Sequence, residues 1–257
     1  MQWSGSVVLV SGGASGLGEG VVRAAAAGGA AGVLVVDVNG DRASALAKEL
    51  GDHVIAVPTD VRDTAAVERA VAAAETTFGR LDVTACCAGV GFVHRVMDRE
   101  GTPMNIDDYR RVIDINLNGT FDIVRRSASL MSRNQPDADN QRGVIVMTAS
   151  LAAYDGQVGQ SAYSASKGGI VGMTLPLARD LAPVGIRVMT IAPGIMDTPI
   201  YEFLPRETFE VLSKLPLNPR RMGTAQEFAH LVGAIVENPY LNGEVIRLDA
   251  GVRLPPK

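Results

Sequence analysis

The chain has 257 residues, a formal net charge of −4, 28 glycines, and a composition that is 47% hydrophobic but only 5% aromatic. This length suits one doubly wound α/β domain, and without a basic excess or a block of like charges neither nucleic acid nor an anionic membrane is expected as the main partner. No apolar run approaches the ~20 residues of a membrane span. The sequence also enters a strand pattern at once, which leaves no space for a signal peptide, so we expect a soluble cytoplasmic protein.

Short β-rich runs alternate with helical segments along the whole chain. Strands are expected at residues 7–10, 33–37, 53–57, 81–87, 143–149, 186–192 and 244–248. Helical segments begin near Leu17, Asp41, Asp63, Asp107, Gln160, Glu207 and Ala225. Strands that are apolar throughout are covered on both faces, and strand–helix–strand alternation gives a parallel sheet. The sequence therefore predicts a single domain over residues 1–257, with a doubly wound (Rossmann) parallel sheet of about seven strands and helices on both faces.

A glycine-rich turn, SGGASGLG, follows the first strand and opens the first helix. Gly12, Gly16 and Gly18 permit tight turning and close backbone approach, so amides at the helix N-terminus can face a pyrophosphate. Asp37 ends the second strand, where a carboxylate would bind the ribose hydroxyls of an adenosine. The same carboxylate would repel a 2′-phosphate, and the turn holds no Arg or Lys. NAD is therefore favoured over NADP.

Two further strand ends carry candidates for the cofactor site. Asp60 follows the third strand and could meet the adenine edge, although an N-cap for the helix after Val61 is an equally open interpretation. The fourth strand ends in CCAG, at residues 86–89, beside the expected cleft. Cys86 and Cys87 are adjacent, which fits neither a disulfide framework nor a CxxC metal spacing, so we expect buried, reduced thiols and no metal.

Residues 105–133 read as one long helix. Its expected inward positions are Ile106, Tyr109, Val112, Ile113, Asn116, Phe121, Ile123 and Val124. Asn116 interrupts this otherwise apolar face. A buried amide needs partners, so Asn116 is either a structural hydrogen-bonding residue or part of a polar relay behind the active site.

Proton-transfer chemistry is indicated by the stretch TASLAAYDGQVGQSAYSASK at residues 148–167. Tyr163 and Lys167 lie four apart at the start of a helix and therefore share a face. A nearby cation favours the phenolate and lowers the pKa of the phenol toward neutrality, where acid–base catalysis works best. Ser150, at the end of the preceding strand, would supply a hydroxyl to the same reacting oxygen.

The segment at about residues 195–219 has two interpretations, as a mobile flap over the substrate or as a surface helix that buries an apolar stripe. Its apolar residues are Tyr201, Phe203, Leu204, Phe209, Leu212 and Leu215. After the fourth strand, His94, Arg95 and Arg99 could meet coenzyme A phosphates, or they could be solvated surface charges.

Taken together, SGGASGLG, Asp37, CCAG, NLNG at 116–119, Ser150, YSASK at 163–167 and APG at 192–194 resemble the short-chain dehydrogenase/reductase family across essentially the whole chain. The resemblance implies Tyr163 as the acid–base residue, assisted by Lys167 and Ser150, and Asn116 as support for a water relay. It implies cofactor contacts from Gly12, Ser15, Gly16, Leu17, Gly18, Asp37, Asp60, Val61, Cys87, Ala88, Gly89, Tyr163, Lys167, Pro193, Gly194, Met196 and Thr198. It also implies a homotetramer in which the helix after Gln160 packs against a second subunit.

A narrower resemblance is carried by residues 156–194 and by ENPYLNGEVIRLD near the C-terminus, which are similar to the type II 3-hydroxyacyl-CoA dehydrogenase branch of that family. Cys87 stands where most of the family has Asn, and this exchange is typical of the branch. The implied substrates are short or branched 3-hydroxyacyl-CoA esters. A hydroxysteroid or general secondary-alcohol dehydrogenase is the alternative, followed by a non-catalytic NAD-sensing protein.

Overall fold

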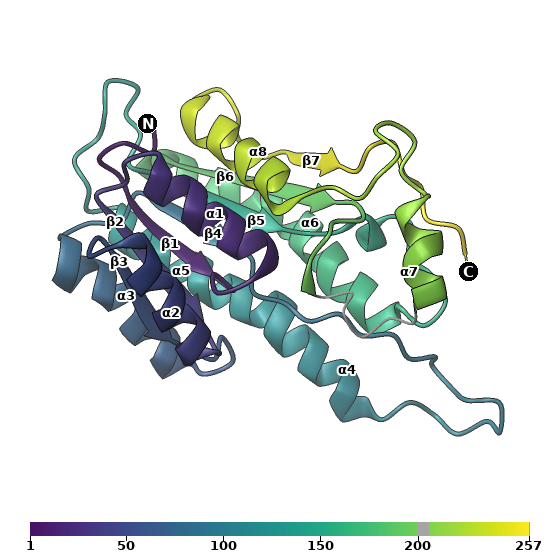
Figure 1. The fold of residues 1–257 in the computed structure, drawn as a ribbon. Helices are drawn as coiled ribbons and strands as arrows, with labels where there is room; N and C mark the ends of the chain where they lie inside the picture. The colour runs from purple at the N-terminus through teal and green to yellow at the C-terminus, as the bar shows by residue number, and fades with distance from the viewer. Residues whose placement is uncertain (200–205, 257) are drawn as a thin grey trace.

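The computed structural model describes residues 1–199 and 206–256, which build a seven-stranded sheet with helices on both faces (Figure 1). The strands are β1 (Val7–Ser11), β2 (Gly32–Asp37), β3 (Val54–Pro58), β4 (Val83–Cys86), β5 (Gly143–Thr148), β6 (Ile186–Pro193) and β7 (Val245–Leu248). They lie in the order β3-β2-β1-β4-β5-β6-β7, and every neighbouring pair is parallel. The predicted doubly wound parallel sheet is therefore confirmed.

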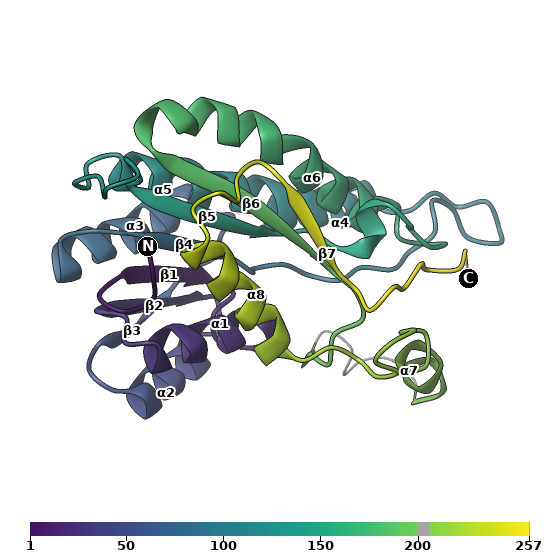
Figure 2. The same cartoon turned by 90° about the horizontal axis from the view of Figure 1, so that it is seen from above.

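Two layers of helices cover the sheet, as the view from above shows (Figure 2). One layer holds α1 (Gly16–Ala27), α2 (Gly40–Leu50) and α8 (Ala225–Glu237), and the other holds α3 (Thr64–Phe78), α5 (Gly119–Met131) and α6 (Ser161–Leu181). The remaining helices are α4 (Ile106–Ile113) and α7 (Arg206–Ser213), and single 3₁₀ turns occupy Leu151–Ala153 and Ala182–Val184. In β1, Val8 and Val10 pack under the first layer and Leu9 under the second, which explains why the strands are apolar throughout.

The long helix expected at residues 105–133 is interrupted. α4 leads into a π-helical segment, Asp114–Asn118, and α5 follows directly. Within this run Val112, Asn116, Ile123 and Val124 are buried as predicted. The inward assignment of Ile106 and Phe121 is wrong, because their exposed fractions are 54% and 46%. Apolar character alone does not distinguish a core residue from an apolar residue on the surface.

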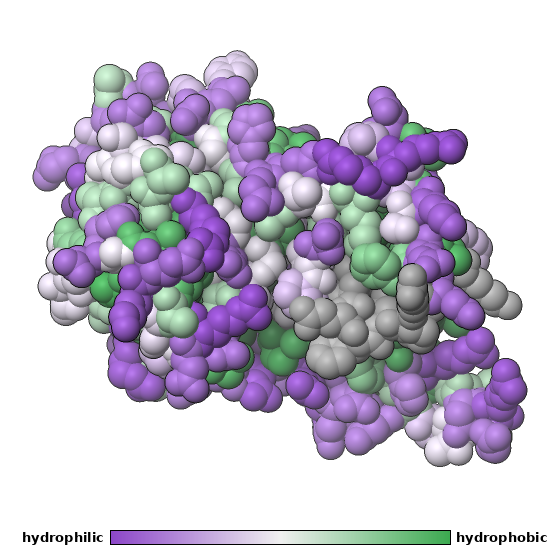
Figure 3. Space-filling model, viewed as in Figure 1, coloured by the Kyte–Doolittle hydropathy of each residue, from purple (hydrophilic) through white to green (hydrophobic). Residues whose placement is uncertain are grey.

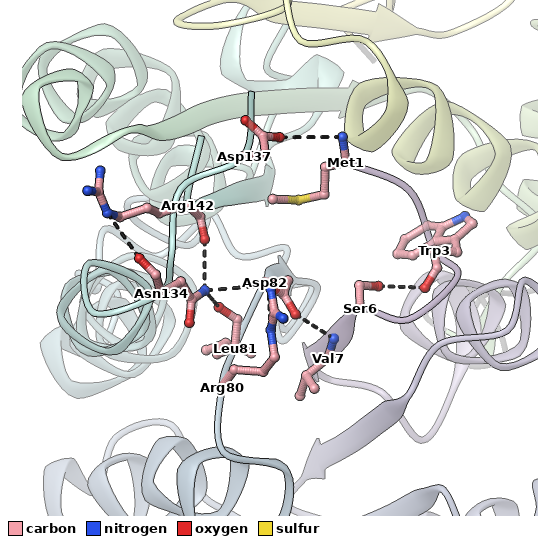
Figure 4. Close-up of polar contacts among 10 residues, drawn as sticks. All are labelled: Met1, Trp3, Ser6, Val7, Arg80, Leu81, Asp82, Asn134, Asp137 and Arg142. Atoms are coloured by element: carbon pink, nitrogen blue, oxygen red, sulfur yellow. Dashed lines mark hydrogen bonds and ion pairs between the residues drawn. The ribbon is translucent and has the colours of Figure 1, made fainter. Parts of the chain in front are cut away.

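Polar contacts fix the amino ends of the central strands (Figure 4). The buried carboxylate of Asp82 accepts a hydrogen bond from Val7 N at 2.8 Å. Asn134 Nδ2 donates to the carbonyl oxygens of Leu81, at 2.6 Å, and Arg142, at 2.8 Å. These contacts tie the connections that enter β1, β4 and β5, so the amino edge of the sheet is closed by structural interactions.

The connection from β4 to α4 projects from one end of the molecule (Figure 1). An antiparallel bridge between Met97 and Pro103 closes this connection on itself. In the space-filling view its region carries both hydrophilic and apolar side chains (Figure 3), and Val93, Val96 and Met97 are between 60% and 69% exposed. Within residues 1–199 and 206–256, no helix combines the length and apolarity that a membrane crossing requires.

Candidate active site

The glycine-rich turn packs against the end of β4, where the order of strands reverses between β1 and β4. Gly12 has φ +66°, and a Cβ built on it would lie 2.6 Å from Ala88 N. A Cβ on Gly18 would overlap the carbonyl oxygen of Gly12. Only glycine fits these two positions, so the turn can lie directly over the crevice where sheets of this order bind nucleotides.

The start of α1 leaves backbone donors available to an anion. Ser15 is its N-cap residue, but its side chain makes no capping hydrogen bond, and the half-buried Leu17 follows in the first turn. A Cβ on Gly16, which has φ +52°, would lie 3.4 Å from Thr198 Cβ. The structure thus brings Thr198 to the glycine turn, and together these residues fit the pyrophosphate of a dinucleotide.

Asp37 lies beside this turn. Its carboxylate accepts hydrogen bonds from Ala14 N at 3.0 Å and from Asn39 N at 2.9 Å. These two bonds fix the Asp37 carboxylate at the carboxyl end of β2, which is the edge of the sheet where the crevice lies. The position fits the expected contact with ribose hydroxyls.

Asp60, after β3, is held by Arg62. Arg62 Nε donates to Asp60 Oδ1 at 3.0 Å, and this side-chain hydrogen bond lowers the pKa of Asp60. The N-cap interpretation of Asp60 is wrong, because α3 is capped by Asp63, whose side chain accepts from Ala65 N at 2.9 Å. Val61 is buried, so only its backbone is available to a cofactor.

The end of β4 brings the two cysteines and Gly89 to the site. Cys86 and Cys87 are both free thiols, and burial raises the pKa of both, that of Cys87 to about 11. Thr148 Oγ1 donates to Cys87 Sγ at 3.7 Å. The expected reduced thiols are therefore protonated at neutral pH, and Cys86 is the more deeply buried of the two.

Ser150 and Tyr163 meet across the crevice from two different elements. Ser150 caps the 3₁₀ turn Leu151–Ala153, where its hydroxyl accepts from Ala152 N at 3.1 Å. Burial raises the pKa of the Tyr163 phenol, and a hydrogen bond with Ser150 acts in the opposite direction. The expected lowering of this pKa is wrong, because desolvation by burial is the largest effect on the phenol and raises its pKa. The phenol is therefore protonated and available as a donor.

Lys167 is buried beside Tyr163 on α6. Its Nζ donates to the carbonyl oxygen of Thr148 at 2.8 Å and lies 5.8 Å from the centroid of the Tyr163 ring. Burial lowers the pKa of Lys167 from 10.5 to about 8. The residue is therefore charged at neutral pH, and that charge faces a site which largely excludes water.

Asn116 connects three segments of the site. Its Oδ1 accepts from Val90 N at 2.8 Å, and its Nδ2 donates to Val90 O and to Ser166 Oγ, both at 3.1 Å. Ser166 Oγ in turn donates to Tyr163 O at 2.8 Å. Asn116 therefore has a structural role, whereas the relay role stays a prediction. The sequence does not predict that Ser166 is a partner of Asn116. The two residues are 50 positions apart, and no spacing in the sequence links them.

Gly89 lies where these side chains converge. A Cβ built on it would be 3.2 Å from Asn116 Oδ1 and 3.6 Å from Lys167 Nζ. A larger residue at Gly89 would therefore enter the space that the lysine and the asparagine share.

The end of β6 supplies the remaining expected cofactor contacts. Pro193 is the last residue of the strand, and a Cβ on Gly194 would lie 2.8 Å from Asp249 Cα. Met196 is 4% exposed with its side chain in the core, so any contact with a cofactor would come from its backbone. Tyr201, Phe203 and Leu204 lie outside the described residues.

Beyond β6, an apolar cluster joins α7 to the Ser150 turn. It consists of the buried residues Leu151, Ile195, Met222 and Val252, with Phe209, Leu212, Leu215 and Leu254 packed against them. The C-terminal part of the predicted substrate segment is therefore a helix that rests on the active-site side of the molecule. His94, Arg95 and Arg99 lie exposed on the projecting connection, where the described residues give Arg95 and Arg99 no ion pair. Residues 1–199 and 206–256 contain no group of three or more His, Cys, Asp or Glu side chains that could hold a metal ion.

A dinucleotide crevice beside a Ser, Tyr and Lys set defines a nucleotide-dependent dehydrogenase of the doubly wound class. The short chain dehydrogenase profile matches residues 6–208. The chain is 49% identical to 3-hydroxyacyl-CoA dehydrogenase type-2 of Homo sapiens, over 98% of this chain and 97% of that protein. The chain belongs to the short-chain dehydrogenase family and is an oxidoreductase.

Solved structures agree with this assignment. The 3-hydroxyacyl-CoA dehydrogenase type-2 from Mycobacterium avium is 42% identical, with a TM-score of 0.93 and coverage of 98% of both chains. The 3-ketoacyl-(acyl-carrier-protein) reductase from Brucella melitensis, solved with NADH, is 29% identical with a TM-score of 0.85, over 98% of this chain and 99% of that one. Together with the family match, these findings support a nucleotide cofactor of the NAD(P) type for this chain.

Proposed function

We propose that the chain catalyses hydride transfer between NAD and the 3-hydroxy or 3-keto group of short or branched acyl-CoA esters. The observation that carries this proposal is the placement of the Ser150 and Tyr163 hydroxyls in hydrogen-bonding contact, with the Lys167 ammonium on the same helix face. A protein that only senses NAD would not need this complete set of proton-transfer groups.

In the proposed reaction, NAD supplies the hydride acceptor for oxidation, and the protein supplies orientation and proton transfer. Ser150 donates a hydrogen bond to the substrate oxygen and holds it against the Tyr163 hydroxyl. Tyr163 takes the alcohol proton in oxidation and returns it in reduction. Lys167 favours the phenolate once its charge is near the developing anion, and the Asn116 contacts with Val90 and Ser166 keep α6 in register with the end of β4.

NAD rather than NADP is supported by the charges around the ribose position. Asp37 is fixed there by two backbone amides. Arg42, the basic residue near the start of α2, is engaged by Glu19, with 3.4 Å between Arg42 Nη2 and Glu19 Oε2. A 2′-phosphate would therefore meet the Asp37 carboxylate, with Arg42 already paired to Glu19.

The acyl-CoA substrate class is supported by the high identity to the human and Mycobacterium avium enzymes named for it. The segment at about 195–219 would cover the acyl group, with Phe209 and Leu212 of α7 on its inner side. His94, Arg95 and Arg99 would then lie on the side from which coenzyme A phosphates approach.

We also propose a cytoplasmic homotetramer. Gly168 and Gly172 on α6 face open space, and Leu175 on the same helix is 44% exposed. Phe121 on α5 is 46% exposed. These features support an apolar helix face that a second copy covers, and the two free thiols support a reducing compartment.

Steady-state kinetics test the proposed function. Acetoacetyl-CoA, 2-methylacetoacetyl-CoA and a panel of ketosteroids are each reduced with NADH and with NADPH as the cofactor. We expect kcat/KM to be highest for a thioester with NADH. Higher kcat/KM for a steroid would support the hydroxysteroid alternative, and preference for NADPH or no turnover of any thioester would refute the proposal.

A further inference from the structure

The chain after β7, residues 249–256, runs past α7 to the C-terminus (Figure 1). We call these residues the C-terminal strap. Along its course Ala250 O accepts from Leu217 N at 3.0 Å, and Pro256 O accepts from Val158 N at 3.0 Å. Pro255 O also accepts from Gln157 Nε2 at 3.0 Å. The strap is therefore bonded both to the segment after α7 and to the loop that leads into the catalytic helix α6.

Arg247, at the start of this region, holds the strap to the Ser150 side of the site. Its Nη2 lies 2.9 Å from Asp155 Oδ2, and its Nε lies 2.8 Å from Asp249 Oδ2. The guanidinium also lies 5.0 Å from the centroid of the Tyr154 ring. Arg247 and Asp155 side chains are only 24% and 23% exposed, so this ion pair is shielded more than an ordinary surface pair.

An apolar contact reinforces the ionic one. Val252 and Leu254 of the strap pack into the cluster that also contains Leu151, next to Ser150, and Phe209 and Leu212 of α7. Residues from three separate parts of the chain therefore share one small core. Movement of the strap would change the separation between the Ser150 turn and α7.

We propose that the C-terminal strap determines substrate specificity by fixing this separation, with the Arg247–Asp155 ion pair as its latch. The inference rests on the proposed function, in which the acyl group enters between the Ser150 turn and α7. The adenosine side of the NAD site is separate from the latch, because the glycine turn and Asp37 contact neither Arg247 nor Asp155. Gly194, at the end of β6, does pack against Asp249, so the Kd of NADH is measured in both latch variants.

The test compares Arg247→Met and Asp155→Ala with Arg253→Met as the matched control. Arg253 Nη1 also binds Asp249 Oδ2, at 3.1 Å, but its side chain is 60% exposed, and its hydrogen bonds go to Asp249 and Val252 rather than to the loop at 154–158. The substrates are acetoacetyl-CoA and 2-methylacetoacetyl-CoA with NADH. One methyl group in an apolar pocket changes kcat/KM by about 10–200-fold. The ratio of kcat/KM between these two substrates therefore reports how firmly the separation between the Ser150 turn and α7 is fixed.

In both latch variants we expect KM for the thioesters to rise about tenfold, which corresponds to about 1.4 kcal/mol. The ratio of kcat/KM between the two substrates should move toward one, whereas the Kd of NADH stays within about twofold. Arg253→Met should resemble the wild type in the KM for the thioesters, in the kcat/KM ratio and in the Kd of NADH. An unchanged substrate ratio, a parallel loss of NADH affinity, or equal effects in the Arg253 variant would overturn the proposal.

Hydrogen exchange of the unliganded protein separates this inference from the proposed function, because it needs no substrate. The latch variants should speed exchange in residues 151–158 and in α7 together, and leave β4 unchanged. If the wild type turns over no thioester, the proposed function fails. Faster exchange in both segments would still support the inference that the strap couples residues 151–158 to α7. If only one segment loosens, or neither does, the strap does not couple them.

Discussion

Lys167 places a positive charge where the fold largely excludes water, so the pH dependence of stability tests the site without any substrate. The residue is 5% exposed, and burial lowers its pKa from 10.5 to about 8. Between those values the unfolded chain retains a proton that the folded chain has released, so the free energy of unfolding rises with pH. The interval between 10.5 and about 8, at 1.36 kcal/mol per pH unit, amounts to about 3 kcal/mol.

The perturbation is Lys167→Met, which keeps an unbranched side chain and removes the titrating group. Urea unfolding of both unliganded chains at about pH 7, 8, 9 and 10 gives the difference in the free energy of unfolding at each pH. We expect that difference to move in favour of the wild type by most of the ~3 kcal/mol as pH rises from about 7 to 10. Groups outside the site, and the raised pKa of Cys87 at about 11, are present in both chains and largely cancel.

At about pH 7 the variant loses the bond from Nζ to Thr148 O, which costs about 1–3 kcal/mol, but it also relieves the desolvation of a charge. Its stability should therefore be close to that of the wild type even though its activity is lost. Lys48→Met, at an exposed position of α2, controls for the loss of one positive charge. A difference that stays constant or falls between pH 7 and 10 would refute the assignment of a buried, charged lysine.

Three further substitutions probe other parts of the molecule. Tyr163→Phe should lower kcat by about 10²–10⁴-fold with the Kd of NADH unchanged in a fluorescence titration, and retention of more than about a tenth of the activity would contradict the acid–base role. Asp37→Ser should raise the NADPH to NADH ratio of kcat/KM by about tenfold, about 1.4 kcal/mol, and an unchanged ratio would remove the ribose contact. Arg187→Met should destabilise the fold by about 1–3 kcal/mol in urea, because the loss of donors to Gln141 and to carbonyls at the end of α8 outweighs the relief of burying a charge; a loss below about 1 kcal/mol would contradict this.

The elements that sequence could predict are those with local causes. Gly12 and Gly18 stand where a side chain would strike backbone, and the strands are apolar because helices cover both faces. The contacts themselves can be distant, as between Gly12 and Ala88, but they leave a pattern within a few residues of sequence, so the strands and the glycine turn are predictable and Asp37 ends β2 as expected. The pairing of Tyr163 with Lys167 on one face follows from helix geometry in the same way.

What sequence could not predict depends on contacts between distant segments. The π-helical segment at Asp114–Asn118 places Asn116 against Val90 and Ser166, and neither partner is visible from the helical period. The pKa of Tyr163 is set by burial and by the hydrogen bond with Ser150, and both are properties of the assembled fold. For the same reason the sequence identifies Phe209, Leu212 and Leu215 as apolar but does not show the core that they share with the C-terminal strap.

In the proposed function, proton transfer and substrate specificity depend on different segments of the chain. Of the proposed proton-transfer groups, Tyr163 and Lys167 lie on α6 and Ser150 follows β5, in a fold that the Brucella melitensis reductase shares at 29% identity. In the proposed function the walls that face the substrate come instead from α7, the Ser150 turn and the strap, which are joined by a small apolar cluster and one shielded ion pair. A substitution in that cluster can change which substrate fits without disturbing Tyr163 or Lys167, so relatives with one catalytic set can act on different molecules. The kcat/KM ratio between substrates should therefore respond to changes at Arg247 or Asp155, and kcat itself to changes at Ser150, Tyr163 or Lys167.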